Sequence, residues 1–153
     1  MIKILFICHG NICRSPMAEF VMKDLVQKAN LQDKIYIESA ATSTEELGNG
    51  MHRGTVTKLR QENIPFTNHR ARQITAQDYN NFDYLIGMDT ANIRNMNRIV
   101  GSDPEGKIYK LLSFAGSGRD VADPWYTGDF ATTYDDVLAG CKGLLEQIIR
   151  EKL

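Results

Sequence analysis

The sequence IKILFICHGNICRSP, residues 2–16, contains three segments with different local preferences. Residues 2–7 form a nearly continuous β-prone apolar run, which is typical of a strand buried on both faces of a parallel sheet. Residues 8–15 are more polar and read as a loop. Ser15 followed by Pro16 is typical of a helix start, with serine as the N-cap and proline at the first helical position. Strand, loop and helix in this order predict the first unit of an α/β fold.

The rest of the chain continues the alternation of strands and helices. Short β-prone segments predict further strands at residues 35–39, 83–88 and 108–112. Apolar spacing and capping residues predict helices at residues 15–29, 51–63, 75–80 and 90–98, and a last helix from residue 130, with Thr75, Asp89 and Asp129 as N-caps of the last three. Such alternation produces right-handed crossovers, so we expect a parallel sheet with helices on both faces. Its site should lie at the carboxyl ends of the strands.

Composition and charge narrow the class of protein. A length of 153 residues with 42% apolar side chains predicts one domain, residues 1–153. Eighteen basic and nineteen acidic side chains give a net charge of −1, which argues against nucleic acid or a membrane surface as partner. No apolar run approaches the roughly 20 residues of a membrane span, and the first apolar stretch is too short for a secretion signal. We therefore expect a cytoplasmic protein, and no pattern predicts its oligomeric state.

The three cysteines predict free thiols rather than a disulfide framework or a metal site. Their number is odd, and the spacing of Cys8 and Cys13 matches no common pattern of zinc ligands. Cys141 lies on the apolar face of the last predicted helix, so we expect it to pack in the core.

The loop at residues 8–15 is predicted to bind an anion. A loop that enters a helix can aim several backbone N–H groups at one point, and Gly10 relaxes the steric limits on the turn. Arg14 adds a guanidinium fork that matches a phosphate-like oxyanion. The predicted phosphate-binding residues are therefore His9, Gly10, Asn11, Ile12, Cys13 and Arg14.

Cys8 makes this loop a candidate catalytic site. The N–H dipoles, the helix end and Arg14 favour the thiolate of Cys8, which can attack phosphorus. Ser15 can donate its hydroxyl to the sulfur and help it leave again, while Asn11 suits left-handed backbone geometry and can lock the loop by hydrogen bonds. In the alternative interpretation, Cys8 ends a core strand as a small hydrophobe and Arg14 is solvated, which leaves the residues between them unexplained.

Cleavage of a phosphate ester also requires an acid that protonates the leaving oxygen. The long predicted loop at residues 113–129 offers three aspartates. Asp129 suits a helix cap and Asp120 has a loose context, whereas Asp123 precedes a proline that restricts its backbone, so we predict Asp123 as the general acid. Trp125 and Tyr126 follow as flat apolar walls for an aromatic leaving group. Alternatively, the Asp-Pro pair is only a turn and the tryptophan only fills the core.

Residues 8–16, together with Asp123-Pro124-Trp125-Tyr126, resemble a low-molecular-weight protein tyrosine phosphatase. Residues 39–40, 69–73 and 87–89 also resemble stretches of this family. The resemblance implies a three-layer, Rossmann-like α/β fold with a four-stranded parallel twisted sheet. It also implies a phosphotyrosine-containing protein as substrate, with no metal and no other cofactor.

The resemblance further implies a role for individual residues. Hydrolysis would proceed in two steps through a phosphocysteine on Cys8, with Arg14 holding the phosphoryl group and Asp123 acting first as acid and then as base. Asn11, Ser15, Ser39 and His69 would support the loop by hydrogen bonds, with Glu19 and Asp89 as further candidates. Cys13 resembles a second loop thiol that can form a protective disulfide with Cys8; in the alternative interpretation it is only a packing residue. Many relatives have an aromatic residue after the second strand, where residues 41–50 offer only Leu47 for the substrate rim.

Two other functions fit part of the pattern. An arsenate reductase resembles the same scaffold, but its chemistry requires further cysteines, and none lies between Cys13 and Cys141. A non-catalytic phosphate-binding module would use the loop but would leave Asp123 without a purpose.

Overall fold

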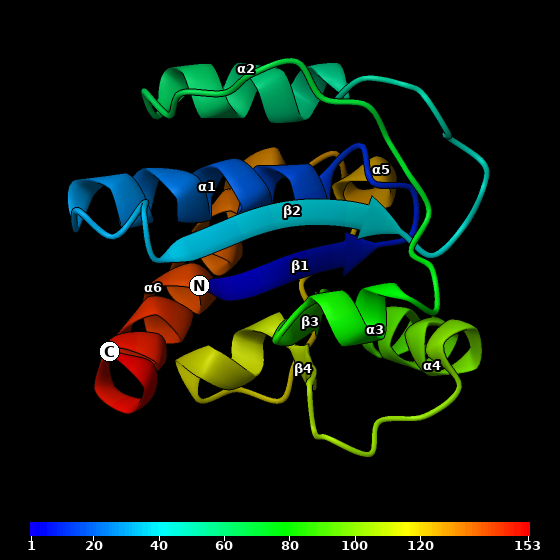
Figure 1. The fold of residues 1–153 in the computed structure, drawn as a ribbon. Coiled ribbons are helices and arrows are strands. Elements are labelled where there is room, and N and C mark those ends of the chain that lie inside the picture. Colours follow the sequence, from blue (N-terminus) through cyan, green and yellow to red (C-terminus); the bar gives the residue numbers. More distant parts are fainter.

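Four parallel strands form the centre of the computed structural model, which describes residues 1–153 (Figure 1). In order across the sheet they are β2 (Ile35–Ala41), β1 (Ile2–Cys8), β3 (Tyr84–Gly87) and β4 (Ile108–Lys110). All three pairings are parallel, and β1 pairs with β2 from end to end.

Helices cover both faces of this sheet (Figure 1). They are α1 (Arg14–Lys28), α2 (Arg53–Gln61), α3 (Asp78–Asn81), α4 (Thr90–Val100), α5 (Pro124–Thr127) and α6 (Phe130–Lys152). A 3₁₀ helix, η1 (Leu111–Ala115), follows β4. The arrangement confirms the predicted three-layer, Rossmann-like α/β fold with a four-stranded parallel sheet. None of the helices combines the length and apolar character needed to span a membrane.

β1 builds the core on both faces because successive side chains of a strand point to opposite sides. Ile4, Phe6 and Cys8 belong to the larger apolar cluster, which also includes side chains of α1, α2 and α6. Leu5 and Ile7 belong to the smaller cluster, with side chains of α3 and α4. The apolar run therefore explains why both sides of the sheet are covered.

The predicted elements differ from the structure at four places. The long loop predicted at residues 113–129 contains the end of η1 and the short helix α5, whose start is capped by the Asp123 side chain. The fourth strand ends at Lys110, because Leu111 and Leu112 turn into η1 and are buried. Thr75 does not cap α3; instead its own N–H donates to Asp78 at 2.8 Å. Ser15 does not cap α1, which begins at Arg14. The predicted caps Asp89 and Asp129 are confirmed: Asp89 accepts from the N–H of Asn92 at 2.7 Å, and Asp129 from that of Thr132 at 3.0 Å.

The carboxyl ends of β1, β2 and β3 meet at one edge of the sheet (Figure 1). The loop between β1 and α1 lies there, and so do the start of α4 and the short helix α5. This edge brings together residues that lie more than one hundred positions apart in the sequence.

Candidate active site

Asn11 holds the loop between β1 and α1 in shape. Its backbone is left-handed (φ 59°) and its side chain is fully buried. The side-chain amide donates to Oγ of Ser15 at 2.8 Å, and its oxygen accepts from the N–H of Arg72 at 3.2 Å. The carbonyl oxygen of Asn11 accepts a 2.7 Å bond from Nε2 of His69, so Asn11 is bound from three sides.

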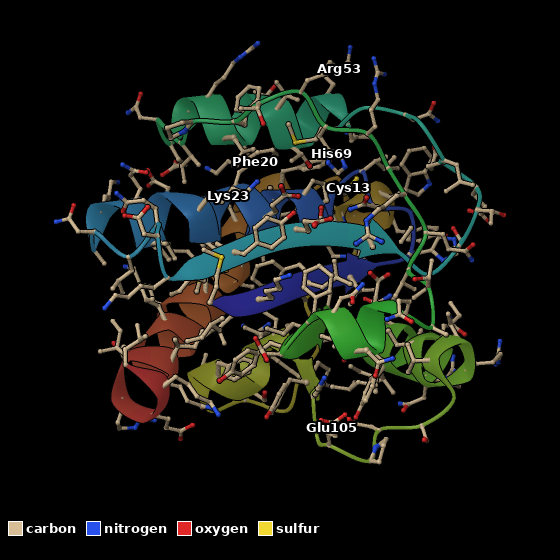
Figure 2. The ribbon with its side chains drawn as sticks, in the orientation of Figure 1. Cys13, Phe20, Lys23, Arg53, His69 and Glu105 are labelled. Carbon is tan, nitrogen blue, oxygen red and sulfur yellow. The ribbon has the colours of Figure 1, made fainter.

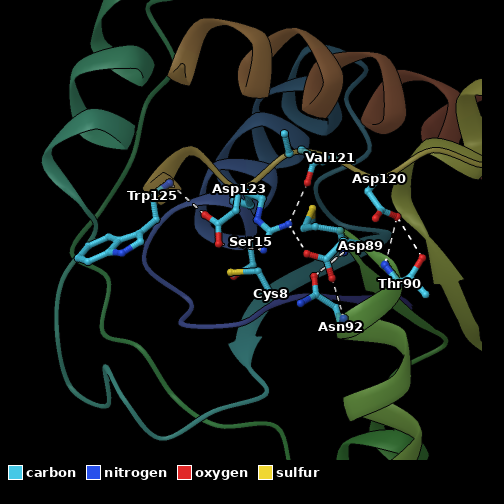
Figure 3. A network of polar contacts seen from close by, with 12 residues as sticks. Cys8, Ser15, Asp89, Thr90, Asn92, Asp120, Val121, Asp123 and Trp125 are labelled. Carbon is cyan, nitrogen blue, oxygen red and sulfur yellow. Dashed lines mark hydrogen bonds and ion pairs between the residues drawn. The ribbon is translucent and has the colours of Figure 1, made fainter. Parts of the chain in front are cut away.

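Two groups face the sulfur of Cys8. Oγ of Ser15 lies 3.0 Å from Sγ, and the N–H of Asn11 points at Sγ from 3.3 Å. Because Oγ of Ser15 accepts a hydrogen bond from the Asn11 amide, its own hydroxyl proton is available for a hydrogen bond to the sulfur. Cys8 is buried, with 3% of its surface exposed, at the end of β1 (Figure 3).

The remaining N–H groups of the loop have no acceptor within the chain. Gly10, Ile12, Cys13, Arg14 and Ser15 make no backbone hydrogen bond through their N–H groups, and α1 has no side chain capping its start. Unpaired N–H groups at a helix N-terminus carry partial positive charge and bind anions. The geometry therefore suits an oxyanion above Cys8.

Arg14 is buried yet held by acidic partners. Its NH1 group donates to Asp89 at 2.7 Å and to the carbonyl oxygen of Val121 at 2.9 Å, and NH2 lies 3.4 Å from Oδ2 of Asp123 (Figure 3). Burial opposes the charge, but the charge of Cys8 and the hydrogen bond to Asp89 outweigh it and raise the pKa of Arg14. The guanidinium therefore stays charged and oriented at the floor of the site.

Asp123 lies beside Arg14 at the start of α5. Its Oδ1 accepts from the N–H of Trp125 at 3.1 Å, which caps α5 and fixes the direction of the carboxyl group. Trp125 and Tyr126 are 57% and 84% exposed and form an aromatic edge next to this carboxyl.

A single cleft contains most of these groups. It is lined by Cys8, His9, Gly10, Ile12, Cys13, Arg14, Glu45, Glu46, Asp123, Trp125 and Tyr126. Leu47, which we expected at the rim, does not line the cleft; Glu45 and Glu46 do, and Nε2 of His9 lies 2.9 Å from Glu45. A side chain at Gly10 would come within 3.3 Å of Cγ of Glu46, so the loop and this wall pack closely.

Two further predicted residues do not line the cleft. His69 supports the loop directly through the carbonyl oxygen of Asn11, and Figure 2 labels it. Ser39 donates to Glu19 at 2.6 Å and so ties β2 to α1, without a hydrogen bond to the loop itself. The sequence interpretation missed Arg72, whose N–H binds Asn11 and whose guanidinium pairs with Asp78 at 3.0 Å. It also missed His52, whose N–H donates to the carbonyl of Ile12 at 2.8 Å.

The other thiols differ from Cys8 in their surroundings. Burial, followed by the charge of Cys8, raises the pKa of Cys13 to about 12, so its thiol keeps its proton near neutral pH. Burial in the core likewise raises the pKa of Cys141, which lies under α1 with its sulfur 3.8 Å from the carbonyl oxygen of Ala18. All three cysteines are free. No group of three or more histidine, cysteine, aspartate or glutamate side chains is arranged to hold a metal ion.

A buried thiol in an anion cradle, with a guanidinium and a carboxyl beside it, is the arrangement of a cysteine-dependent phosphatase. The model of the family described as "Low molecular weight phosphotyrosine protein phosphatase" matches residues 3–153. The low molecular weight protein-tyrosine-phosphatase YfkJ of Bacillus subtilis is 42% identical over 154 residues, which cover 99% of each chain. Its crystal structure aligns with 100% of this chain and 98% of its own, with a TM-score of 0.96. PtpA of Staphylococcus aureus is 39% identical over 152 residues, covering 99% of this chain and 96% of its own.

The chain therefore belongs to the low molecular weight protein tyrosine phosphatase family. It is a phosphoric monoester hydrolase that hydrolyses phosphotyrosine, and its substrates are phosphotyrosine-containing proteins.

Proposed function

We propose that hydrolysis proceeds in two steps through a phosphocysteine on Cys8. In the first step Sγ of Cys8 attacks phosphorus and the bond between phosphorus and the tyrosine oxygen breaks. Asp123 gives its proton to the leaving phenol oxygen. In the second step the Asp123 carboxylate takes a proton from water as the water oxygen attacks phosphorus. The bond from sulfur to phosphorus then breaks, which releases phosphate and the thiolate.

The observation that carries this proposal is the surroundings of Cys8. The hydroxyl of Ser15 and the N–H of Asn11 face a sulfur that opens onto the same cleft as Arg14 and Asp123. The unpaired N–H groups of the loop and the guanidinium of Arg14 are suited to hold the phosphoryl oxygens. Oδ1 of Asp123 accepts from the N–H of Trp125 and Oδ2 faces Arg14, so the carboxyl group is held at both oxygens beside the cleft.

The rim of the cleft supports a proposal for the remaining site residues. Trp125 and Tyr126 would flank the phenol ring. The opposite wall of the cleft would be formed by Glu45 and Glu46 rather than by Leu47. Asn11, Ser39 and His69 would support the loop, with Ser39 acting through Glu19.

Two properties outside the reaction belong to the same proposal. We place the protein in the cytoplasm. Its three free thiols are compatible with a reducing compartment, and so is its net charge of −1. Cys13, which lines the cleft, would protect Cys8 through a reversible disulfide. Mass spectrometry after mild peroxide should then show a peptide that links Cys8 and Cys13, and over-oxidised Cys8 without that link would refute the protective role.

Rapid quenching tests the two-step route. Asp123→Ala, mixed with p-nitrophenyl phosphate in the presence of a chelator, should accumulate phosphoprotein, because this phenol leaves without an acid while the second step lacks its base; Cys8→Ser should form none. Turnover without phosphoprotein in any variant would contradict the intermediate.

Arsenate turnover coupled to thioredoxin would favour a reductase, but Cys141 is buried under α1 and is badly placed to relay a disulfide. Phosphate binding with no turnover would favour a binding module.

A further inference from the structure

Asp120, which lies three residues before the proposed general acid, is fastened to two other elements. Its Oδ1 accepts from Nζ of Lys110 at 2.8 Å, at the end of β4. The same oxygen accepts from the N–H of Thr90 at 3.1 Å and from its hydroxyl at 3.2 Å, at the first position of α4. Nζ of Lys110 also donates to the Thr90 hydroxyl at 3.2 Å, so each of the three side chains contacts the other two. Figure 3 shows the contacts between Asp120 and Thr90. We call Asp120, Lys110 and Thr90 the Asp120 clamp.

The segment that carries Asp123 has few other attachments. Between residues 118 and 123, the only N–H that donates to a backbone carbonyl is that of Val121, to Met88 at 2.9 Å. Arg119, just before the clamp, pairs with Asp136 of α6 through contacts of 3.0 and 2.6 Å. Side chains therefore fix this segment where a regular element would use backbone hydrogen bonds.

The segment from Asp120 to Asp123 is short, and its residues are held in place. Val121 follows Asp120 directly, is fully buried and accepts from Arg14. Asp123 comes two residues later, where Pro124 restricts its backbone and Trp125 holds one of its oxygens. A shift of the chain at Asp120 is thus passed on to the carboxyl of Asp123, and a displacement of about 1 Å is enough to lower a rate by up to about 100-fold.

We propose that Asp120 is a positioning residue for the general acid, acting through the clamp to hold Asp123 above Cys8. The hydrogen bond and charge of Lys110, together with Thr90, lower the pKa of Asp120, so the clamp carboxyl remains ionised at neutral pH. This inference rests on the proposed role of Asp123 and adds a residue that does not line the cleft.

Leaving-group dependence provides a test that a merely structural role would not pass. The value of kcat/KM covers the steps up to departure of the phenol, and a phenol that leaves easily needs little help from an acid. Asp120→Ala should therefore lower kcat/KM about 10-fold for phenyl phosphate but less than about 2-fold for p-nitrophenyl phosphate. Asp120→Asn retains an acceptor oxygen and should show a smaller loss. Lys110→Met should reproduce the pattern, and Lys110→Arg should restore most of the rate.

Asp103→Ala is a matched control. Asp103 is also an aspartate with a lowered pKa, bound by Tyr79 at 2.6 Å and by the N–H of Lys107 at 2.7 Å. It lies away from the site: Glu105, two residues along, is at the edge of the molecule opposite Cys13 (Figure 2). Asp103→Ala should lower stability while slowing both substrates equally or not at all.

Combining substitutions separates failure of the clamp from failure of the proposed acid. If Asp120 acts through Asp123, adding Asp120→Ala to Asp123→Ala should lower kcat/KM for phenyl phosphate no further. An additional loss, or an equal loss for both substrates, would overturn the positioning role.

If Asp120→Ala does not fold, Lys110→Met is judged by the same criteria. If Asp123→Ala itself slows both substrates equally, the proposed acid is wrong. If only Asp123→Ala discriminates between them, the acid stands and the clamp is refuted.

Discussion

Replacing Asn11 by alanine should destabilise the protein more than a simple loop substitution would. The change removes the donor to Ser15 and the acceptor for the N–H of Arg72, both at a fully buried position, and leaves alanine in a left-handed backbone. Each hydrogen bond contributes about 1 kcal/mol net, and the left-handed backbone costs alanine about 1 kcal/mol, so we expect a loss of about 3 kcal/mol. For a chain of this size that corresponds to a fall in Tm of about 6–12 °C.

Asn63 provides the comparison that isolates the hydrogen bonds. Its backbone is also left-handed (φ 57°), but its side chain is exposed and makes no hydrogen bond within the chain. Asn63→Ala should therefore lose only the backbone contribution of about 1 kcal/mol. Thermal unfolding followed by circular dichroism measures both variants at neutral pH. Equal Tm values for the two variants would show that the buried hydrogen bonds of Asn11 contribute nothing measurable to stability, contrary to this prediction.

Three further predictions test packing, pH dependence and specificity. A Cβ at Gly143 would lie 2.0 Å from the carbonyl oxygen of Phe114, whereas one at Gly118 would meet nothing within 4 Å. Gly143→Ala should therefore lower the free energy of unfolding in urea by about 3 kcal/mol, Gly118→Ala should not, and similar values would contradict the packing of α6 on η1. The pKa of Asp103 is lowered in the native state by Tyr79 and neighbouring N–H groups, which outweigh its partial burial. The stability that Asp103 provides should thus be complete above the ordinary aspartate pKa of about 3.9 and should fall as pH drops through its lower native pKa. The wild-type protein should therefore be more stable than Asp103→Asn at neutral pH, and an advantage that persists unchanged at pH 2 would contradict this. Finally, substituting both Glu45 and Glu46 by glutamine should raise kcat/KM severalfold for phosphotyrosyl peptides with acidic flanks at low salt and much less at high salt; an unchanged ratio between acidic and basic peptides would rule out an electrostatic role for this wall.

The parts of the fold that local patterns specify were predictable from the sequence. The apolar run of β1 indicates burial on both faces, and Asp89 and Asp129 cap helices as their positions suggest. The end of β4 was not predictable in this way, because Leu111 resembles a strand residue. It lies in η1 instead, packed so closely on α6 that a Cβ at Gly140 would come within 2.5 Å of it. Tertiary packing overrides local β preference at this point.

The candidate site likewise contains residues that local sequence patterns indicate and others that depend on distant contacts. Cys8, Arg14 and Asp123 could be named as candidates from the sequence because each has a local context that suits its proposed chemistry. The carbonyl oxygen of Val121 and the carboxyl of Asp120 could not, because a main-chain atom has no residue type and the partners of Asp120 lie 10 and 30 positions away. The acidic wall formed by Glu45 and Glu46 also depends on how the loop after β2 folds back over Gly10, and no local pattern encodes that.

The misassigned N-cap at Ser15 is informative because it follows a sound local rule. A serine before a proline normally stabilises a helix start by about 1 kcal/mol through its side-chain oxygen. Here that oxygen accepts from Asn11 and its proton faces the sulfur of Cys8, so the first turn of α1 remains without a side-chain cap. The unpaired N–H groups that result are the ones that can hold a phosphoryl group. The chain thus leaves a helix end unsatisfied beside the proposed nucleophile, and a rule based on helix stability fails at a serine whose hydroxyl faces the Cys8 sulfur instead.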